Sequence, residues 1–570
     1  MKRKIRYILL AAMFCFFLFL ELLLMNTSPD HFDAAYYLSQ IEAIVEGKRK
    51  LFEFNTFQYI HELYFVLSAI FFRIFGIFNL NVEKTTLLMS IILGAFIPLL
   101  IYKIVKNLYS SDFWGFIAGF LIMFNPLVLW YSNEIMTDLP TLFFITLSFL
   151  LLTEFFIKPK NYKLILASFI LGACLLLRFS SFFVFPAFIF LLFIKSDKSD
   201  KIKNILLSLF FFITPISFYI IFNNYYLQDF LYVDWQAKAS LANFNLTSLK
   251  ILAISLINIF TSFFVLTLVL GFIAILILFF KRKIKTKEFN LKIIFPLVWL
   301  IPFSIYSLFL PIFVCRYTRH FLLNLPGFIL LFTAILFYLK PYFNKKIMGY
   351  IFFTASFCFL LDWTIINNID FYTITDFFLI VPSLIPFILK FVLIIGSIFI
   401  FVYIAFYYFS NKFKKHQEKL NLLFILFIIC VTSFAYTFPT LYLNHTKINS
   451  EKAVALWFAQ NTPENAVIAA NHEWPFDNYY VRNRTIINPF DKNSTLQTKN
   501  YLDNSYSIYF SENYPSYLEE FINNSDYEII KVGTILKEIL RNQKEGNNHF
   551  MNYWLSKQAH DIRMFVLKKK

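Results

Sequence analysis

Apolar runs long enough to cross a lipid bilayer recur along this chain as far as about residue 440. Inside roughly 30 Å of hydrocarbon only helices and closed barrels satisfy all their backbone hydrogen bonds, and runs of this length predict helices. The chain is 59% hydrophobic and only 15% charged, far from the composition of soluble globular proteins. The first run, residues 8–24, lacks a small-residue cleavage site, so we interpret it as a retained span. The sequence therefore predicts a polytopic α-helical membrane protein.

Lysine and arginine gather in every second loop between these runs. The formal net charge of +17 would suggest a nucleic-acid partner in a soluble protein, but here the charge follows loop position, so no such partner is expected. The positive-inside rule places the basic loops and the N-terminus in the cytoplasm and gives about thirteen spans. An odd number of spans leaves the C-terminal segment outside the cell membrane. The basic loops are residues 2–6, 102–107, 158–163, 195–203, 281–288, 340–346 and 411–419.

The composition changes from about residue 445, where polar residues become frequent and apolar runs shrink to strand length. We therefore divide the chain into a transmembrane domain, residues 1–444, and a small extracytoplasmic α/β domain, residues 445–570. A helix with Ser450 as candidate N-cap is expected before a strand at 466–470. Further strands and helices are expected at SIYF, PSYLEEFINN, YEIIKVGTI and RMFVL. The five cysteines form no disulfide framework and no zinc-ligand spacing.

The outer segment at 26–62 contains SPDHFDAAYYLSQ at residues 28–40 and continues as an amphipathic pattern. Its apolar positions are Tyr37, Leu38, Ile41, Ile44 and Val45, as in a helix lying at the membrane surface. Asp30 and Asp33 stand where this helix begins. An acid there serves either as a general base held close to a hydroxyl or as the N-cap of the helix. Spacing alone leaves both interpretations open.

A second outer turn, WYSNEIMTDLP at residues 130–140, carries Glu134 and Asp138. The two acids share a face if the turn is helical, or else Asp138 caps the next span. Carboxylates at a membrane boundary with no basic neighbour in the same turn require water, a metal or a substrate. His61 and Glu62 would complete a divalent metal site of mixed nitrogen and oxygen ligands with these acids, but ligands so scattered along the chain leave the metal open.

Three arginines are predicted on the outer side. Arg178 interrupts GACLLLRFSSFFVF, and Arg316 and Arg319 stand in VCRYTRHF. Arginine is costly in hydrocarbon and binds phosphate through two N–H groups, so a lipid-linked phosphate or a phospholipid headgroup is its natural partner. For Arg178, snorkelling to ordinary headgroups is the alternative. Arg316 and Arg319 oppose the positive-inside bias and therefore require a functional reason.

Nucleotide-binding motifs are absent from the sequence. It has no glycine-rich phosphate loop and no dinucleotide fingerprint, and its expected cytoplasmic loops do not much exceed about ten residues. A cytoplasmic nucleotide-sugar site is therefore not expected. If the outer acids catalyse a reaction, an activated substrate has to reach them on a lipid.

Five segments follow one another in the order FDAAYYLSQIEAIVEG, HELYFVLSAIFFRIFG, LLMSIILGAFIPLLIYKIVKNLYS, FWGFIAGFLIMFNPLVLWYSNEIMTDLPTLFF and LILASFILGACLLLRFSSFFVFPAFIFLL. This order resembles the N-terminal half of the GT-C glycosyltransferases, in the branch of the protein mannosyltransferases and lipid A aminoarabinose transferases. RYTRHFLLNLPGFILL at 316–331 is similar to the family's Arg-Tyr-rich stretch before a Leu- and Pro-rich span. ALWFAQNTPENAVIAAN resembles the start of the C-terminal domain in many of these relatives.

The resemblance implies a GT-C fold and roles for several outer residues. The family's acid in the first outer loop matches Asp33, which would be the base that activates the acceptor hydroxyl. Ala34 stands where the family commonly has a second acid, and Asp30 is an auxiliary candidate. The acid of the family's second outer turn matches Asp138. Of the family's His-Pro-Pro pattern only His61 is kept, followed by Glu62 and Leu63.

We therefore expect an integral membrane glycosyltransferase that moves a sugar from a polyprenyl-phosphate donor to a hydroxyl on a glycan, lipid or protein. Attack assisted by one carboxylate would invert the anomeric configuration. The leaving phosphate would be bound by cationic and neighbouring residues. These are Arg178, Arg316, Tyr317 and Arg319. Two alternative functions remain. The first is a transporter or flippase of lipid-linked glycans, for which charges in the middle of spans and broken helices in both halves are expected. The second is a membrane scaffold without catalysis.

Overall fold

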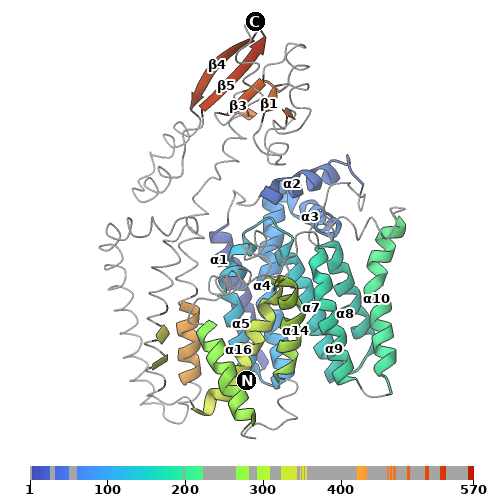
Figure 1. The fold of residues 1–570 in the computed structure, drawn as a ribbon, viewed down its shortest axis with the longest axis vertical. Helices are drawn as coiled ribbons and strands as arrows, with labels where there is room; N and C mark the ends of the chain where they lie inside the picture. Colours follow the sequence, from blue (N-terminus) through green and yellow to red (C-terminus); the bar gives the residue numbers. More distant parts are fainter. Residues whose placement is uncertain are drawn as a thin grey trace. The chain divides into compact units, whose positions relative to one another are not determined.

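The computed structural model describes most of the first 222 residues and parts of the remainder (Figure 1). The described residues fall into two compact units. The first unit comprises residues 1–25, 50–67 and 87–442, and the second comprises residues 26–49, 68–86 and 443–570. The residues described are 3–25, 32–50, 61–196, 199–222, 265–280, 292–308, 322–342, parts of 347–358, 420–431, 433, parts of 459–469, 484–487, 508–511, 527–534 and 563–569.

The first unit is helical. Its helices are α1 (Arg3–Leu23), most of α4 (Val82–Tyr109), α5 (Asp112–Met123), α6 (Pro126–Ser132), α7 (Asp138–Ile157), α8 (Asn161–Ala173), α9 (Phe185–Lys195), α10 (Lys201–Phe222), α14 (Ile294–Leu308) and α16 (Leu325–Leu339), with further helices at Val265–Phe280 and Leu420–Val431. Two short 3-10 helices, η2 (Cys174–Leu176) and η3 (Phe179–Val184), interrupt the path from α8 to α9. The third, η5 (Lys340–Tyr342), follows α16.

Among the described residues, five helices are long and apolar enough to cross a membrane, or six if the bent pair α5 and α6 forms one span. The predicted class of helical membrane protein is therefore confirmed. The expected total of about thirteen spans extends into residues outside the described part and stays a prediction. α3 (Glu62–Phe75) has 14 residues, fewer than the roughly 20 that a span requires.

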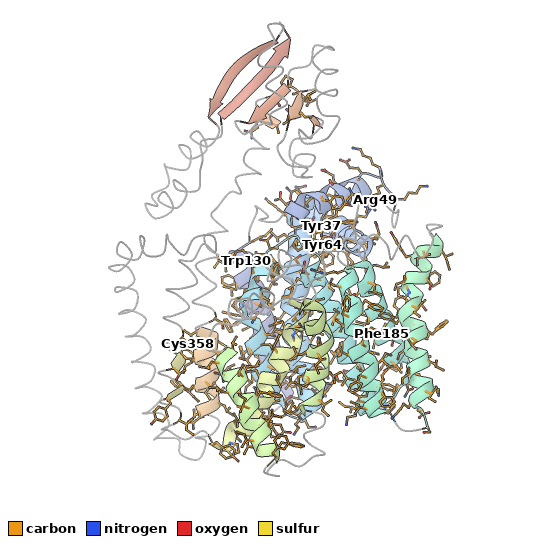
Figure 2. All side chains as sticks on the ribbon, viewed as in Figure 1. Tyr37, Arg49, Tyr64, Trp130, Phe185 and Cys358 are labelled. Atoms are coloured by element: carbon orange, nitrogen blue, oxygen red, sulfur yellow. The ribbon has the colours of Figure 1, made fainter. Side chains whose placement is uncertain are left out.

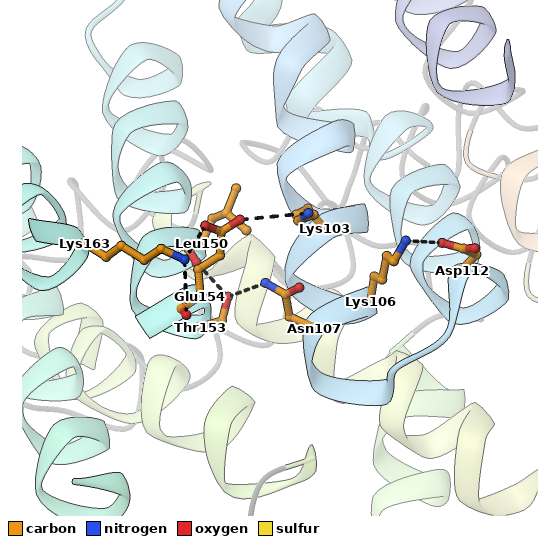
Figure 3. A network of polar contacts seen from close by, with 8 residues as sticks. All are labelled: Lys103, Lys106, Asn107, Asp112, Leu150, Thr153, Glu154 and Lys163. Atoms are coloured by element: carbon orange, nitrogen blue, oxygen red, sulfur yellow. Dashed lines mark hydrogen bonds and ion pairs between the residues drawn. The ribbon is translucent and has the colours of Figure 1, made fainter. Parts of the chain in front are cut away.

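Charged contacts join helix ends that carry three of the predicted basic loops, 2–6, 102–107 and 158–163, at one end of the first unit, and Figure 3 shows the contacts of the last two. Lys106 near the end of α4 lies 2.6 Å from Asp112, which opens α5. Glu154 in the last turn of α7 accepts from Lys163 of α8, with 3.1 Å between the nitrogen and oxygen atoms. Arg6 of α1 lies 3.8 Å from the same Asp112. The beginning of α1 therefore shares this end with the basic loops, as alternating spans require.

Aromatic side chains hold several helices of the first unit together. Phe149 of α7 stacks on Trp299 of α14 with ring centroids 4.0 Å apart, and the Trp299 indole donates to the Leu323 carbonyl at 3.1 Å. Phe185 of α9, labelled in Figure 2, stacks on Phe212 of α10 at 3.6 Å. Close packing of this kind resists small displacements, so the loops between these helices are carried on a rigid scaffold.

The second unit contains α2 (Phe32–Val45) and η1 (Gly76–Phe78). A helix is confirmed in this segment, and its residues Tyr37, Leu38, Ile41 and Ile44 are at most 5% exposed, whereas its place at the membrane surface stays a prediction. Asp33 is the second residue of α2, so it lies within the helix rather than at the capping position before it. The Arg49 guanidinium after the helix donates to the Gln40 side chain at 2.9 Å.

The C-terminal part of the second unit contains a mixed five-stranded sheet in the order β2-β1-β3-β5-β4. The strands are β1 (Val467–Ala469), β2 (Thr485–Ile487), β3 (Ile508–Ser511), β4 (Tyr527–Thr534) and β5 (Arg563–Lys569). β1 pairs in parallel with β2 and β3, while β5 pairs antiparallel with β3 and β4. The strand predicted at 466–470 is confirmed as β1. β3, β4 and β5 fall on SIYF, YEIIKVGTI and RMFVL, where strands and helices were expected to alternate, and β2 was not predicted. The helices expected between them lie outside the described residues, so the α/β domain remains a prediction.

Candidate functional site

The acidic turn, residues 133–137, lies between α6 and α7 within the stretch 130–140 that was predicted as an outer turn, and α6 is separated from α5 by a break. The Asn125 side-chain oxygen accepts from the Leu127 N–H at 3.0 Å, and Pro126 occupies the first helical position, where a missing N–H costs nothing. The two helices meet at 60°. α6 ends after seven residues, and residues 133–137 lead into α7. These five turn residues are all at most 4% exposed, so this non-helical backbone is covered by protein, as its membrane setting requires.

Asp138 is the first residue of α7 and is 1% exposed. The capping position belongs to Thr137, whose side chain makes no capping hydrogen bond. The interpretation of Asp138 as a simple helix cap is therefore wrong, because its carboxylate forms an ion pair with Arg178. Glu134 is also buried, at 4% exposure, but the turn that carries it is not helical. The two acids therefore do not share a helix face.

Arg178 reaches Asp138 from the connection between α8 and α9. It lies between η2 and η3 with an extended backbone, at φ −161° and ψ 119°. Its Nη1 pairs with Asp138 Oδ1, and its Nε donates to the Ser180 hydroxyl at 3.0 Å. The side chains of Arg178 and Asp138 are only 13% and 1% exposed. A buried charge without its partner is strongly unfavourable, so each residue of this pair depends on the other.

His61 is joined to the segment that carries Arg178. Its Nδ1 lies 2.6 Å from the carbonyl oxygen of Leu177, and the His61 side chain is buried. A carbonyl oxygen can only accept a hydrogen bond, so Nδ1 carries the proton in this contact. Glu62, which opens α3, is 3% exposed. The structure thus brings together three predicted residues, with Asp138 paired to Arg178 and His61 bonded to the residue before Arg178.

Glu21, in the last turn of α1, contacts the acidic turn and was not predicted. It is fully buried, and its Oε2 accepts a hydrogen bond from the side-chain amide of Asn133, the first residue of the acidic turn. The signal for it was present, because Glu21 is the one acid inside the apolar run at residues 8–24. Ionisable residues inside spans are expensive and mark functional or structural sites.

The roles of five other predicted residues are not tested by the described part of the chain. Asp33 belongs to α2 in the second unit. Asp30, Arg316, Tyr317 and Arg319 lie outside the described residues. Their roles therefore stay predictions.

A metal centre is not assembled within the described residues, which contain no group of three His, Cys, Asp or Glu side chains able to hold an ion. His61 and Glu62 alone would supply two ligands, whereas a protein site for a catalytic metal usually supplies three or more. A metal bound here would therefore need a ligand from elsewhere in the chain or from the substrate.

The family model described as dolichyl-phosphate-mannose-protein mannosyltransferase matches residues 63–222, which contain Glu134, Asp138 and Arg178. Comparison with curated proteins returned no match. Among solved structures, the chain is similar to ArnT from Cupriavidus metallidurans bound to undecaprenyl phosphate, with a TM-score of 0.62 and 12% identity over 98% of this chain and 97% of that one. The apo state of ArnT gives 0.60 and 10% identity, with the same coverage.

A third similar structure is the apo oligosaccharyltransferase of Archaeoglobus fulgidus, with a TM-score of 0.48 and 12% identity. The match covers 86% of this chain and 65% of that one. At such low identities it is the likeness to ArnT, over nearly the full length of both chains, that shows a shared fold.

Proposed function

We propose, from the GT-C fold that this chain shares with ArnT, that it is an integral membrane glycosyltransferase. It would move a sugar from a polyprenyl-phosphate donor to a hydroxyl on a glycan, lipid or protein. Support comes from the match of residues 63–222 to the mannosyltransferase model and from the undecaprenyl phosphate bound to ArnT. The family description names mannose on dolichyl phosphate, and the ArnT structure holds undecaprenyl phosphate. Both lipids are polyprenyl phosphates, the class of carrier that we expect for the donor.

The single observation that carries the proposal is the buried pair of Asp138, at the start of α7, and Arg178, between η2 and η3. Charges and broken backbone are costly in a membrane and are kept where they line a cavity or act on a substrate. A guanidinium has five N–H donors in a planar fork. Its contacts with Asp138 and Ser180 are therefore compatible with a further contact to a phosphate.

The reaction requires one base and one cationic pocket. Asp33, matched by the family resemblance, would take the proton of the acceptor hydroxyl. The hydroxyl oxygen would bond to the anomeric carbon while the bond from that carbon to the phosphate oxygen breaks. The electron pair leaves with the polyprenyl phosphate, and attack from the opposite face inverts the anomeric configuration.

The leaving phosphate gains negative charge as this bond breaks, so cationic donors near it lower the barrier. Arg178, Arg316 and Arg319 would supply these donors, with Tyr317 as a neutral one. Asp138 would hold the Arg178 guanidinium in one orientation. Orientation matters because a displacement of about 1 Å at a reacting group can reduce a rate by on the order of 100-fold.

The proposed topology follows the distribution of basic residues. With Arg6, Lys106 and Lys163 at one end of the first unit, the positive-inside rule would place that end in the cytoplasm. The acidic turn and Arg178 would then face the outer side, and the C-terminal sheet would be extracytoplasmic. About thirteen spans are part of this proposal.

The experiment is sugar transfer from a polyprenyl-phosphate donor in membranes that contain Asp33→Asn at normal protein level. Transfer is expected to be lost, because an amide cannot take up the hydroxyl proton. Glu46→Gln, at an exposed acid just after α2, is the matched control and should keep full activity. Transfer that survives Asp33→Asn would remove Asp33 as the base, and movement of the lipid across the bilayer without transfer would favour a flippase.

A further inference from the structure

We propose that Glu21 is a positioning residue, which holds the acidic turn at residues 133–137 through Asn133 and so fixes the orientation of the Asp138–Arg178 pair. The structural part of this proposal concerns the turn alone. Its effect on turnover rests on the proposed function.

Glu21 is poorly suited to the inside of a membrane span unless it has a specific contact. Its side chain is fully buried, and within the described residues its Oε1 has no hydrogen-bond partner while its Oε2 accepts from the Asn133 amide. A buried polar group with one satisfied atom and one unsatisfied atom costs stability relative to an apolar side chain of similar size. The contact with Asn133 is the feature of the structure that gives Glu21 a role.

Asn133 connects α6 to the acidic turn. Its backbone N–H closes α6 by donating to the Trp130 carbonyl at 3.1 Å, and its side chain donates to Glu21. Glu134 follows directly, and Asp138 begins α7 at the other end of the turn. A bond to Glu21 therefore connects α1 to the first residue of the segment that carries both acids.

Gly94 of α4 brings these elements close enough for that bond. A Cβ atom at Gly94 would lie 2.5 Å from the Ser132 hydroxyl, 3.2 Å from Leu139 Cδ2 and 3.3 Å from the Phe17 ring. Ser132 and Leu139 flank the turn on its two sides. Phe17 lies one helical turn before Glu21, so both project from the same face of α1. The turn is therefore packed on α4 at both of its ends and hydrogen-bonded to α1 at its start.

These contacts predict how removal of the Glu21 carboxylate affects the Asp138–Arg178 pair. Without the acceptor on α1, the buried Asn133 amide loses this hydrogen bond, and the turn loses its bonded connection to α1. Asp138 and the Arg178 guanidinium would shift with it. Binding of the lipid-linked donor depends on several other groups, so the loss should fall on kcat more than on KM.

The test compares three changes in the full-length protein. Glu21→Leu removes the acceptor and should lower kcat by at least about tenfold, given the sensitivity of rates to placement. Glu21→Gln keeps an acceptor oxygen of the same reach and should stay within about threefold of the unchanged protein. Asn133→Leu should match Glu21→Leu, and the double substitution should cost no more than either alone. Met13→Ala, a buried packing change elsewhere in α1, should lower stability without lowering kcat of the folded protein.

A readout independent of activity is hydrogen–deuterium exchange of the peptide that spans residues 131–140. Exchange should become faster in Glu21→Leu and stay unchanged in Glu21→Gln. Unchanged exchange and unchanged kcat in Glu21→Leu would overturn the proposal, and so would equal losses in Glu21→Gln and Glu21→Leu. If the unchanged protein transfers no sugar but exchange still rises in Glu21→Leu, the proposed function fails while the positioning role stands.

Discussion

Asp138, the first residue of α7, and Arg178, between η2 and η3, form an ion pair in which the two side chains are 1% and 13% exposed. Each residue stands at the end of a non-helical segment or within one, Asp138 after the turn that follows α6 and Arg178 in the connection from α8 to α9. The pair closes the turn after α6 against the segment after α8. This contact connects the two outer features that the sequence singled out separately, the acidic turn and the isolated arginine.

The buried ion pair makes a prediction about stability. Asp138→Leu or Arg178→Leu alone should destabilise the protein by about 3–5 kcal/mol, because each leaves an uncompensated buried charge. The double substitution should cost less than either single one. Thermal unfolding in detergent measures this, with Glu46→Gln at the exposed contact with Lys48 as a control that should leave the midpoint unchanged. Additive losses in the double variant would contradict an energetic pairing of the two residues.

The hydrogen bond from His61 to the Leu177 carbonyl predicts different effects for two amide replacements. The side-chain amide of asparagine sits close to the position of Nδ1, whereas that of glutamine sits closer to Nε2. His61→Asn should therefore keep the bond and most of the transfer rate, and His61→Gln should lower the rate by about tenfold through displacement of Arg178. Rate constants in membranes with equal protein levels decide between them. Equal activity of both variants would show that the Leu177 contact does not hold the site.

Gly172 marks the closest approach of helices found at any glycine in the described part of the first unit. A Cβ atom there would collide with the backbone carbonyl of Phe212, which cannot rotate aside as a flexible side chain can. Gly172→Ala should therefore push α8 away from α10 and destabilise the protein by about 1–3 kcal/mol. Gly76→Ala is the matched control, since its Cβ would meet its nearest neighbour, the Phe72 ring, at an ordinary 3.6 Å. A lower unfolding temperature is expected for the first change only.

The proposed topology predicts which positions a membrane-impermeant thiol reagent can reach. Lys158→Cys, at the exposed end of α7, should be labelled only after the membrane is opened, because that end carries the basic loops. Lys48→Cys, at the exposed end of the segment after α2, should be labelled in intact cells. Labelling of the cysteines already present is measured in the unchanged protein and subtracted. Labelling of Lys158→Cys in intact cells would reverse the orientation.

The parts of this fold that were predictable from the sequence are those with a local sequence pattern. The spacing of Tyr37, Leu38 and Ile41 predicted α2, and short apolar pieces predicted β1 and indicated the regions of β3, β4 and β5, because both signals depend only on neighbouring residues. Membrane helices followed from apolar length alone. The Asn-Pro pair at 125–126 is also a local signal for a break, although the bend at that point was not predicted.

The site was less predictable because its contacts join residues far apart in the sequence. Nothing near Asp138 in the sequence indicates that its charge is balanced by Arg178, and its place at the start of the next span suggested a helix cap as one alternative. The role of His61 depends on a backbone carbonyl, which every residue offers, so no residue pattern marks Leu177. Glu21 was detectable as an acid in an apolar run, but its partner Asn133 follows only from the packing around Gly94.

The most direct test of the central claim uses the purified full-length protein in liposomes with a polyprenyl-phosphate sugar and a mixture of cell-envelope acceptors. The measurement is release of polyprenyl phosphate coupled to transfer of labelled sugar, compared with the Arg178→Leu variant at equal folded amounts. The account predicts stoichiometric release and transfer, reduced on the order of 100-fold in the variant because the leaving phosphate loses a placed donor. Turnover unaffected by Arg178→Leu, or translocation of the intact lipid without release, would contradict it.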